Sequence, residues 1–204
     1  MINKLNLLVV GMLVIMSIPV SAQETTDTLD SYQQIIDIFR RNQHRQDSVK
    51  HYRDSIEQAA KKRCKLGYLV SNFQFPDING STVSLKDFGG KYVFIDVWAT
   101  WCAPCRREIP YLRKLEEFFH KKKIVFVSIS IDQDADDWKR MVKDQKLDGI
   151  QLFAGVDKRL KEEFGILTIP RFILLDQEGK VVDAYMTRPS DEVTKERLEK
   201  LEGI

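Results

Sequence analysis

The sequence predicts an α/β domain built on a mixed central sheet with helices on both faces, preceded by a helical arm. Apolar runs typical of buried strands alternate with amphipathic helical stretches, which is the order expected for a sheet covered on both faces. Near the C-terminus two strands follow each other through a short turn, which favours an antiparallel closing hairpin. The 204 residues leave room for one domain of about 150 residues and an appendage.

Composition excludes several classes of protein. Hydrophobic residues make up 43% of the chain and charged residues 30%, so the chain can bury a core and is not disordered throughout. The formal net charge is only +2, so the chain as a whole has no attraction for nucleic acid. Three cysteines are too few for a disulfide-stapled scaffold. Their spacing is therefore the informative property.

Residues 1–22 are expected to be a signal peptide rather than part of the fold. Lys4 precedes an apolar run that ends near Val20, and small residues before Gln23 suit cleavage there. An uncleaved membrane anchor is the alternative, because the run approaches the length of a spanning helix. In either case we expect the rest of the chain outside the cytoplasm, in the periplasm, where thiol chemistry is oxidising.

Residues 23–66 contain neither proline nor glycine and are expected to form a charged helical arm. Apolar residues recur there at helical spacing on either side of a polar gap around Asn42: Leu29, Tyr32, Ile36 and Phe39, then Val49, Tyr52 and Ile56. Asp27 is a candidate N-cap. The arm either packs as one or two solvated helices, serves dimerisation or partner docking, or spaces the domain from a membrane.

The main domain is expected from residue 67 to residue 204. Asn79-Gly80 between apolar runs at 73–75 and 82–85 predicts a hairpin. The later elements are expected in this order: a buried strand at 92–98, a helix at 103–120, a strand at 124–131, a helix at 136–145, a strand at 150–153, a helix at 157–164, a hairpin of 172–175 with 181–185, and a helix at 190–201 with Ser190 as its candidate cap.

Cys102 and Cys105 stand where the strand at 92–98 passes into a helix, and this context makes a common tetrapeptide informative. Unpaired N–H groups at a helix N-terminus stabilise an anion, so we expect a lowered pKa for the Cys102 thiol and a nucleophilic thiolate. Cys105 is expected within reach, but more buried and less acidic. Ala103 leaves the approach to Cys102 open, and Pro104 is tolerated because the first helical turn needs no N–H donor.

A zinc site and a pair of inert core thiols are the alternatives for this motif. Zinc usually takes four ligands, and the further candidates lack ligand spacing: Cys64, His44, His51 and His120. We therefore expect no metal and no cofactor. Cys64 remains open as a spare thiol, an intermolecular bridge or a regulatory partner of the pair.

Residues 132–137 imitate the start of a calcium-binding loop. Asp137 stands where that loop needs glycine, and Lys143 stands where it needs a bidentate glutamate. We expect these acids to be helix-start charges that complement the helix dipole.

Three residues outside the pair strengthen a redox interpretation. Asp96 interrupts the most apolar strand, so burial is expected to raise its pKa and to place it for relaying a proton to or from Cys105 through water. A hydrogen-bonded structural carboxylate is the alternative. Pro170 follows Ile169 and precedes a strand, which demands a special turn and favours a cis bond. Pro110 falls inside a predicted helix and is expected to kink it.

From about residue 67 to residue 201 the chain resembles the thioredoxin superfamily and is most similar to its extracytoplasmic TlpA/ResA-like thiol-disulfide oxidoreductases. The resemblance rests on residues 94–105, FIDVWATWCAPC, on the RREIP that follows, and on Thr168-Ile169-Pro170. The sequence departs from the family in two places. Many TlpA/ResA-like members carry another residue type where Asp96 stands, and Arg171 follows the proline where smaller residues are common; this cation would acidify Cys102 or attract acidic partners.

The resemblance implies a thioredoxin-like sheet, Cys102 as the attacking cysteine and Cys105 as the resolving one. It also implies that Asp96 is a buried acid and that Pro170 is a cis-proline facing the active site. An extended substrate segment would bind at Trp101, Ala103, Pro104, Ile169 and Pro170.

The leading hypothesis is an enzyme that exchanges disulfides with exported proteins in the cell envelope, with a membrane-embedded thiol relay as electron donor. The absence of histidine between the cysteines favours the reductase direction. Cytochrome c maturation, cell redox homeostasis and envelope repair are family roles among which the sequence does not choose. A thiol-dependent peroxidase and a non-enzymatic adaptor that docks through residues 23–66 are the alternatives.

Overall fold

The structure is a computed structural model that describes residues 22–70 and 72–204. Contacts within the chain define two compact units, Met1–Tyr52 and Arg53–Ile204. The predicted signal peptide lies outside the described residues except for Ala22. Within the described ranges, no helix is both long and apolar enough to cross a membrane.

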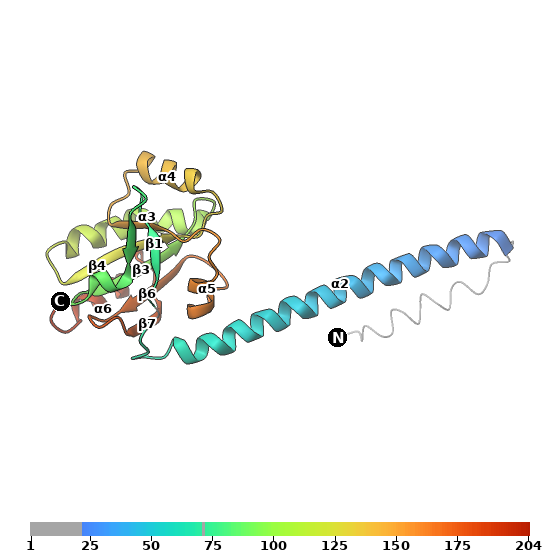
Figure 1. The fold of residues 1–204 in the computed structure, drawn as a ribbon, viewed down its shortest axis with the longest axis horizontal. Helices are drawn as coiled ribbons and strands as arrows, with labels where there is room; N and C mark the ends of the chain where they lie inside the picture. Colours follow the sequence, from blue (N-terminus) through green and yellow to red (C-terminus); the bar gives the residue numbers. More distant parts are fainter. Residues whose placement is uncertain (1–21, 71) are drawn as a thin grey trace. The chain divides into compact units, whose positions relative to one another are not determined.

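A single helix, α2 (Ala22–Arg63), runs through the predicted arm (Figure 1). The polar gap around Asn42 does not interrupt the helix, because its glutamines and arginines are good helix formers and neither glycine nor proline is present. Asp27 lies inside α2, so the prediction that it caps the helix is wrong. Ile56 and Ala60, near the end of α2, are buried within the second unit.

The second unit is built on a five-stranded sheet with strand order β5-β4-β3-β6-β7. Its strands are β3 (Tyr92–Trp98), β4 (Ile124–Ser130), β5 (Ile150–Phe153), β6 (Arg171–Leu175) and β7 (Val181–Met186). The first three are parallel, whereas β6 runs antiparallel to β3 and β7 antiparallel to β6. This arrangement confirms the predicted mixed sheet.

The hairpin predicted around Asn79-Gly80 is also present. It consists of β1 (Gln74–Pro76) and β2 (Thr82–Ser84), which pair antiparallel and are followed by a 3₁₀ helix, η2 (Leu85–Phe88). Gly80 has a φ of +87° in the connecting turn, a conformation that glycine adopts without steric cost.

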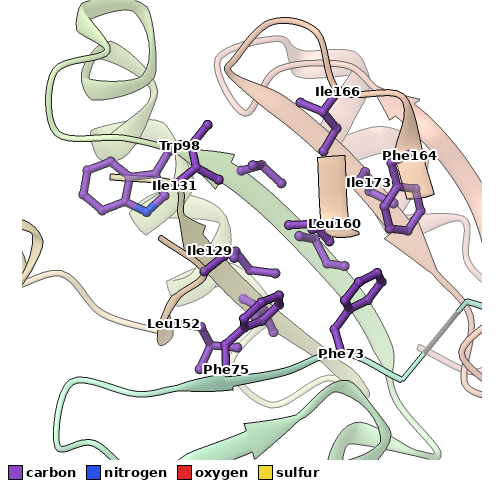
Figure 2. Close-up of a cluster of buried hydrophobic side chains, with 14 of the residues drawn as sticks. Phe73, Phe75, Trp98, Ile129, Ile131, Leu152, Leu160, Phe164, Ile166 and Ile173 are labelled. Carbon is purple, nitrogen blue, oxygen red and sulfur yellow. The ribbon is translucent and has the colours of Figure 1, made fainter. Parts of the chain in front are cut away.

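Helices cover both faces of the sheet, as predicted. On one face, α3 (Ala103–Phe119) and α6 (Glu192–Glu199) pack over one apolar cluster. On the other, α4 (Ala135–Asp144), α5 (Arg159–Phe164) and the β1–β2 hairpin share a larger cluster. Figure 2 shows Phe73 and Phe75 reaching the same cluster as Leu160 and Phe164.

Strand β3 lies at the centre of the sheet and all seven of its residues are buried. Successive side chains of a strand point to opposite faces: Ile95 and Val97 join the larger cluster, whereas Phe94 packs with the residues of α3. The same alternation directs Asp96 toward α3. The carboxyl end of β3 leads directly into the loop that precedes Cys102.

The start of the last helix differs from the prediction. Asp191, not Ser190, is the N-cap of α6, and its carboxylate accepts a hydrogen bond from the backbone N–H of Val193. Ser190 is engaged elsewhere, because its backbone N–H and its hydroxyl both donate to Glu108. Pro110 lies inside α3, where the sequence placed it.

Candidate functional site

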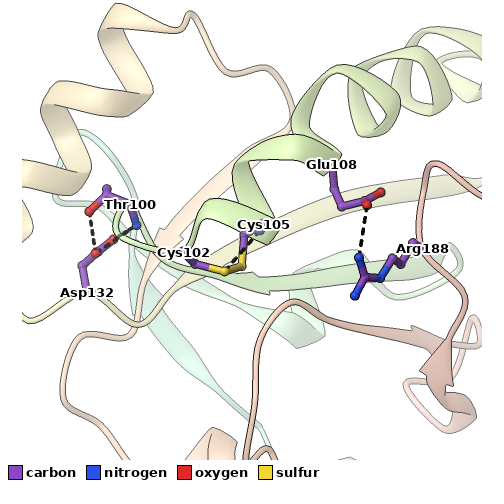
Figure 3. The surroundings of a disulfide bond; sticks show 6 residues. All are labelled: Thr100, Cys102, Cys105, Glu108, Asp132 and Arg188. Carbon is purple, nitrogen blue, oxygen red and sulfur yellow. Dashed lines mark hydrogen bonds and ion pairs between the residues drawn. A yellow bond between two sulfur atoms is a disulfide. The ribbon is translucent and has the colours of Figure 1, made fainter.

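Cys102 is the N-cap of α3 and is joined to Cys105 by a disulfide bond of 2.02 Å (Figure 3). The Sγ atom of Cys102 accepts a hydrogen bond of 3.2 Å from the backbone N–H of Cys105. The first turn of α3 therefore aims a backbone donor at this sulfur. This is the environment that stabilises a thiolate once the disulfide is reduced.

Both cysteines are 3% exposed, whereas the sequence led us to expect Cys105 to be the more buried of the two. In the disulfide-bonded state the two residues are therefore equally buried. Trp101, immediately before the pair, is 65% exposed, and Ala103 is exposed as well. These two residues therefore form exposed surface on either side of Cys102 in the sequence.

Asp132 anchors the loop between β3 and the cysteine pair. Its buried carboxylate accepts hydrogen bonds of 3.0 and 3.1 Å from the Thr100 N–H and of 2.8 Å from the Thr100 hydroxyl (Figure 3). The hydroxyl of Ser130 donates to the same group at 2.7 Å. Sequence reasoning considered Asp132 only as a calcium-loop residue. Its position just after a buried strand parallel to β3 was the signal for this role, because such strand ends meet at one edge.

Glu108 is a second buried carboxylate near the disulfide, one turn after Cys105 in α3. It accepts hydrogen bonds from the backbone N–H and the hydroxyl of Ser190, and the Arg188 guanidinium lies 3.8 Å away (Figure 3). The sequence singles out Glu108 only as part of the RREIP segment that follows Cys105. Its spacing of three from Cys105, which puts both on one helix face, was the available signal.

Asp96 is buried in β3, as expected, with 7% of its surface exposed. Burial raises the pKa of its carboxyl group to about 8, and the carboxylates of Glu116 and Glu108 add to the rise. Its Oδ1 atom has no hydrogen-bond partner among the described residues. Asp96 therefore holds a proton far more readily than an exposed aspartate.

The Ile169–Pro170 peptide bond is cis, as the sequence favours. In the register of the sheet Arg171 pairs with Val97, so Pro170 lies just beyond the paired residues, at the end of the sheet where β3 leads to Cys102. Ile169 packs against the apolar cluster that includes both cysteines. The structure thus brings the proline turn and the cysteine pair to one edge of the sheet.

Arg171 stacks on Tyr185, with its guanidinium carbon 4.1 Å from the ring centroid. Cys64 is a free, half-buried thiol whose Sγ donates to the carbonyl of Phe164 at 3.4 Å. Burial raises the pKa of the Cys64 thiol, and the charge of Arg171 opposes this rise.

In the described part of the chain no cluster of three or more histidine, cysteine, aspartate or glutamate side chains is arranged to hold a metal ion.

Comparisons with known proteins show what the chain is similar to. A model of the Redoxin family matches residues 65–201. The thiol-disulfide oxidoreductase ResA of Bacillus thuringiensis strain Al Hakam is 32% identical over 143 residues, which make up 69% of this chain and 79% of that protein.

Solved structures are similar as well. The solution structure of a Bacteroides vulgatus protein is 53% identical and superposes with a TM-score of 0.62 over 65% of this chain and 88% of that chain. The thioredoxin domain of a thiol-disulfide oxidoreductase from Bacteroides vulgatus is 33% identical, with a TM-score of 0.61 over 67% of this chain and 96% of that chain.

Proposed function

Because this chain belongs to the Redoxin family, as a TlpA/ResA-like thiol-disulfide oxidoreductase of the thioredoxin superfamily, we propose that its cysteine pair reduces disulfides of exported proteins. The observation that carries the proposal is the Cys102–Cys105 disulfide at the start of α3, with a backbone N–H aimed at the Cys102 sulfur. Two sulfurs that bond reversibly at this position provide a two-electron couple.

In the proposed reaction the Cys102 thiolate attacks a substrate disulfide. A mixed disulfide forms, and the first substrate sulfur leaves as a thiolate. Cys105 then loses its proton and attacks the Cys102 sulfur, which releases the second substrate sulfur. Two electrons pass to the substrate, its thiolates take protons from solvent, and the Cys102–Cys105 disulfide remains.

In its ionised form, which a pKa of about 8 leaves as the minor form at neutral pH, Asp96 is the proposed acceptor of the Cys105 proton, through water. A carboxyl group with a pKa of about 8 is close to the ordinary pKa of a thiol, so proton transfer between the two groups is nearly balanced. An exposed aspartate, with a pKa near 3.9, would be a far weaker base. Burial of Asp96 in β3 is what brings the pKa of its carboxyl group close to that of a thiol.

The proposed binding surface for an extended substrate segment combines the two loops at this edge of the sheet. Trp101, Ala103 and Pro104 supply the side next to the disulfide, and Ile169 with the cis Pro170 supplies the other. A short stretch of substrate backbone pairing with Ile169 would hold the disulfide in place by main-chain hydrogen bonds.

We propose the reductase direction because no histidine stands between the cysteines. A dithiol in the membrane is the proposed donor that returns the pair to the reduced state. The proposed location is the periplasm, reached through a signal peptide at residues 1–22, and residues 23–66 are the proposed arm. Cytochrome c maturation and envelope redox homeostasis are the proposed processes.

Reduction of insulin disulfides tests the assignment. We expect Cys102→Ser to abolish turnover and Cys105→Ser to accumulate a mixed disulfide with the substrate, because the resolving thiol is gone. Cys64→Ser is the matched control and should retain turnover. Undiminished insulin reduction by Cys102→Ser would overturn the proposal, and faster consumption of peroxide than of insulin disulfides would favour the peroxidase alternative.

A further inference from the structure

A small cavity of about 20 Å³ lies between the central sheet and α3. Asp96 of β3 lines it together with Trp98, Gln151 and Glu116. One water molecule fits a polar cavity of this size when the cavity offers two to four hydrogen-bonding partners. The cavity is therefore a candidate water site in direct contact with the carboxyl group of Asp96.

Three buried polar atoms of the residues that line this cavity lack protein partners. Among the described residues, Asp96 Oδ1, Trp98 Nε1 and Gln151 Oε1 are buried and make no hydrogen bond. The Nε2 atom of Gln151 donates to the carbonyl of Asp148 at 2.6 Å, which leaves its oxygen for the cavity. A single water would accept from Trp98 and donate to the two oxygens, which satisfies all three groups.

Glu116 connects this inner cavity to the surface. It lines the cavity and also a larger, open hollow of about 530 Å³ between the last turns of α3 and the residues of β4 and β5. A Cβ atom built on Gly149 would lie 2.4 Å from Glu116 Oε1. The glutamate carboxyl is thus seated against the Gly149 backbone, at the boundary between the two spaces.

The charges around the cavity fit a group that exchanges protons near neutrality. Burial raises the pKa of Glu116 to about 7; Asp148 adds to the rise and Arg113 opposes it. Besides Asp96, the charged groups that line the cavity are Arg113 and Glu116 from α3 and Asp148 from the loop before β5, while β4 and β5 contribute the neutral Ser128 and Gln151. Glu108 of α3 does not line the cavity but acts on Asp96 through its charge. Arg113 pairs with Asp148 at 3.4 Å and so holds this loop against α3.

We propose that Glu116 is a positioning residue for proton transfer, which carries the Asp96 proton through the cavity water to solvent on the side of α3. The inference rests on the proposed role of Asp96 as the acceptor of the Cys105 proton. When Cys105 attacks, its proton passes to the ionised form of Asp96, the electron pair left on its sulfur forms the new S–S bond to Cys102, and the bond from Cys102 to the substrate sulfur breaks. Asp96 passes this proton to the water, the water gives one of its own to Glu116, and Glu116 releases it. Each group returns to its starting state.

The test follows the two thiol-release steps separately in the full-length, reduced protein. Dithiobis-nitrobenzoate is the probe, and every protein in the test carries Cys64→Ser, because the free thiol of Cys64 would react with the probe as well. Attack of Cys102 on the probe releases one coloured thiolate and leaves a mixed disulfide, and attack of Cys105 on this mixed disulfide releases the second. We expect Glu116→Gln to slow the second phase by roughly tenfold at neutral pH, less than the ~100-fold or more typical of losing a base itself. The first phase should be unchanged.

Two further measurements separate proton transfer from a structural effect. Glu116→Asp should keep most of the second-phase rate, and imidazole, a small proton carrier, should restore the rate of Glu116→Gln but not raise that of wild type. Glu117→Gln is the matched control, because Glu117 is exposed and borders only the outer hollow. It should show the wild-type pH profile.

The failure of this inference is distinct from the failure of the proposed function. If Asp96→Asn slows the second phase while Glu116→Gln matches wild type from pH 5.5 to 9, the exit through Glu116 is wrong and the role of Asp96 stands. If neither variant slows that phase, both proposals about Asp96 and Glu116 are overturned, whereas Cys102→Ser still tests the disulfide chemistry by itself.

Discussion

At Asp96 the raised pKa has a consequence for stability. The folded protein holds this proton up to about pH 8, whereas the unfolded chain releases it near pH 3.9. Between these values the folded state binds more protons than the unfolded state, so stability falls as pH rises; below the window nothing is lost, and above it the full loss remains without further change with pH. Asp96→Asn cannot ionise, so we expect it to gain stability relative to wild type across the window, by at most about 1.4 kcal/mol per pH unit.

Urea unfolding of the two oxidised proteins at several pH values between 4 and 8 measures this difference. Asp144→Asn, which changes an exposed carboxylate on α4, is the control and should follow wild type. Parallel pH curves for wild type and Asp96→Asn would mean that Asp96 does not hold a proton at neutral pH in the folded state.

Whether a residue of the candidate site could be predicted from the sequence depends on how far away in the sequence its partners lie. The sequence alone located Cys102, Cys105 and Asp96, because motif spacing and strand alternation are local properties. Glu108 and Asp132 were missed, since their partners are 82 and 32 residues away and only the folded sheet brings them together. Local patterns could not reveal those pairings.

At the scale of elements, the junction between α5 and the end of α2 is an unusually close contact. Gly165 ends α5 with a φ of +57°, and a Cβ there would lie 2.4 Å from the Cβ of Ala60. We expect Gly165→Ala to lower the unfolding free energy by about 1–2 kcal/mol for the left-handed backbone and by a further 1–3 kcal/mol for the overlap. Gly80→Ala carries only the backbone cost, since nothing lies within 4 Å of its Cβ position.

Chemical denaturation of Gly165→Ala and Gly80→Ala separates the cost of the left-handed backbone from the cost of the overlap with Ala60. Equal losses in both would show that α2 moves away from α5 without cost, and that the last turns of α2 do not hold tightly to the domain.

Strands and helices of the main domain were predicted closely because each has a clear periodicity and a terminator, such as Gly165 after α5. Capping residues were less predictable. Ser190 and Asp191 are both good N-caps. The choice between them depends on Glu108, because the hydroxyl of Ser190 donates a hydrogen bond to its carboxylate. In the arm the sequence left one or two helices open, and the structure has one, because polarity does not end a helix that lacks glycine and proline.

For the whole molecule, the boundary between arm and domain decides what folds independently. The sequence suggests a domain from residue 67, but Ile56 and Ala60 are buried in the unit that begins at Arg53. Burial of an isoleucine side chain contributes about 1.5–3 kcal/mol. We therefore expect a chain of residues 53–204 to match residues 23–204 in unfolding free energy, and a chain of residues 67–204 to be less stable by at least about 2 kcal/mol.

Both shortened chains should still reduce insulin, because the cysteine pair, Asp96 and the cis-proline turn all lie beyond residue 67. Urea unfolding and insulin turbidity on the same samples measure stability and activity separately. If residues 67–204 proved as stable as residues 53–204, the contacts of Ile56 and Ala60 would add nothing to the fold, and α2 would be an appendage along its whole length. A loss of stability with retained turnover would instead make the last turns of α2 part of the scaffold that supports the site.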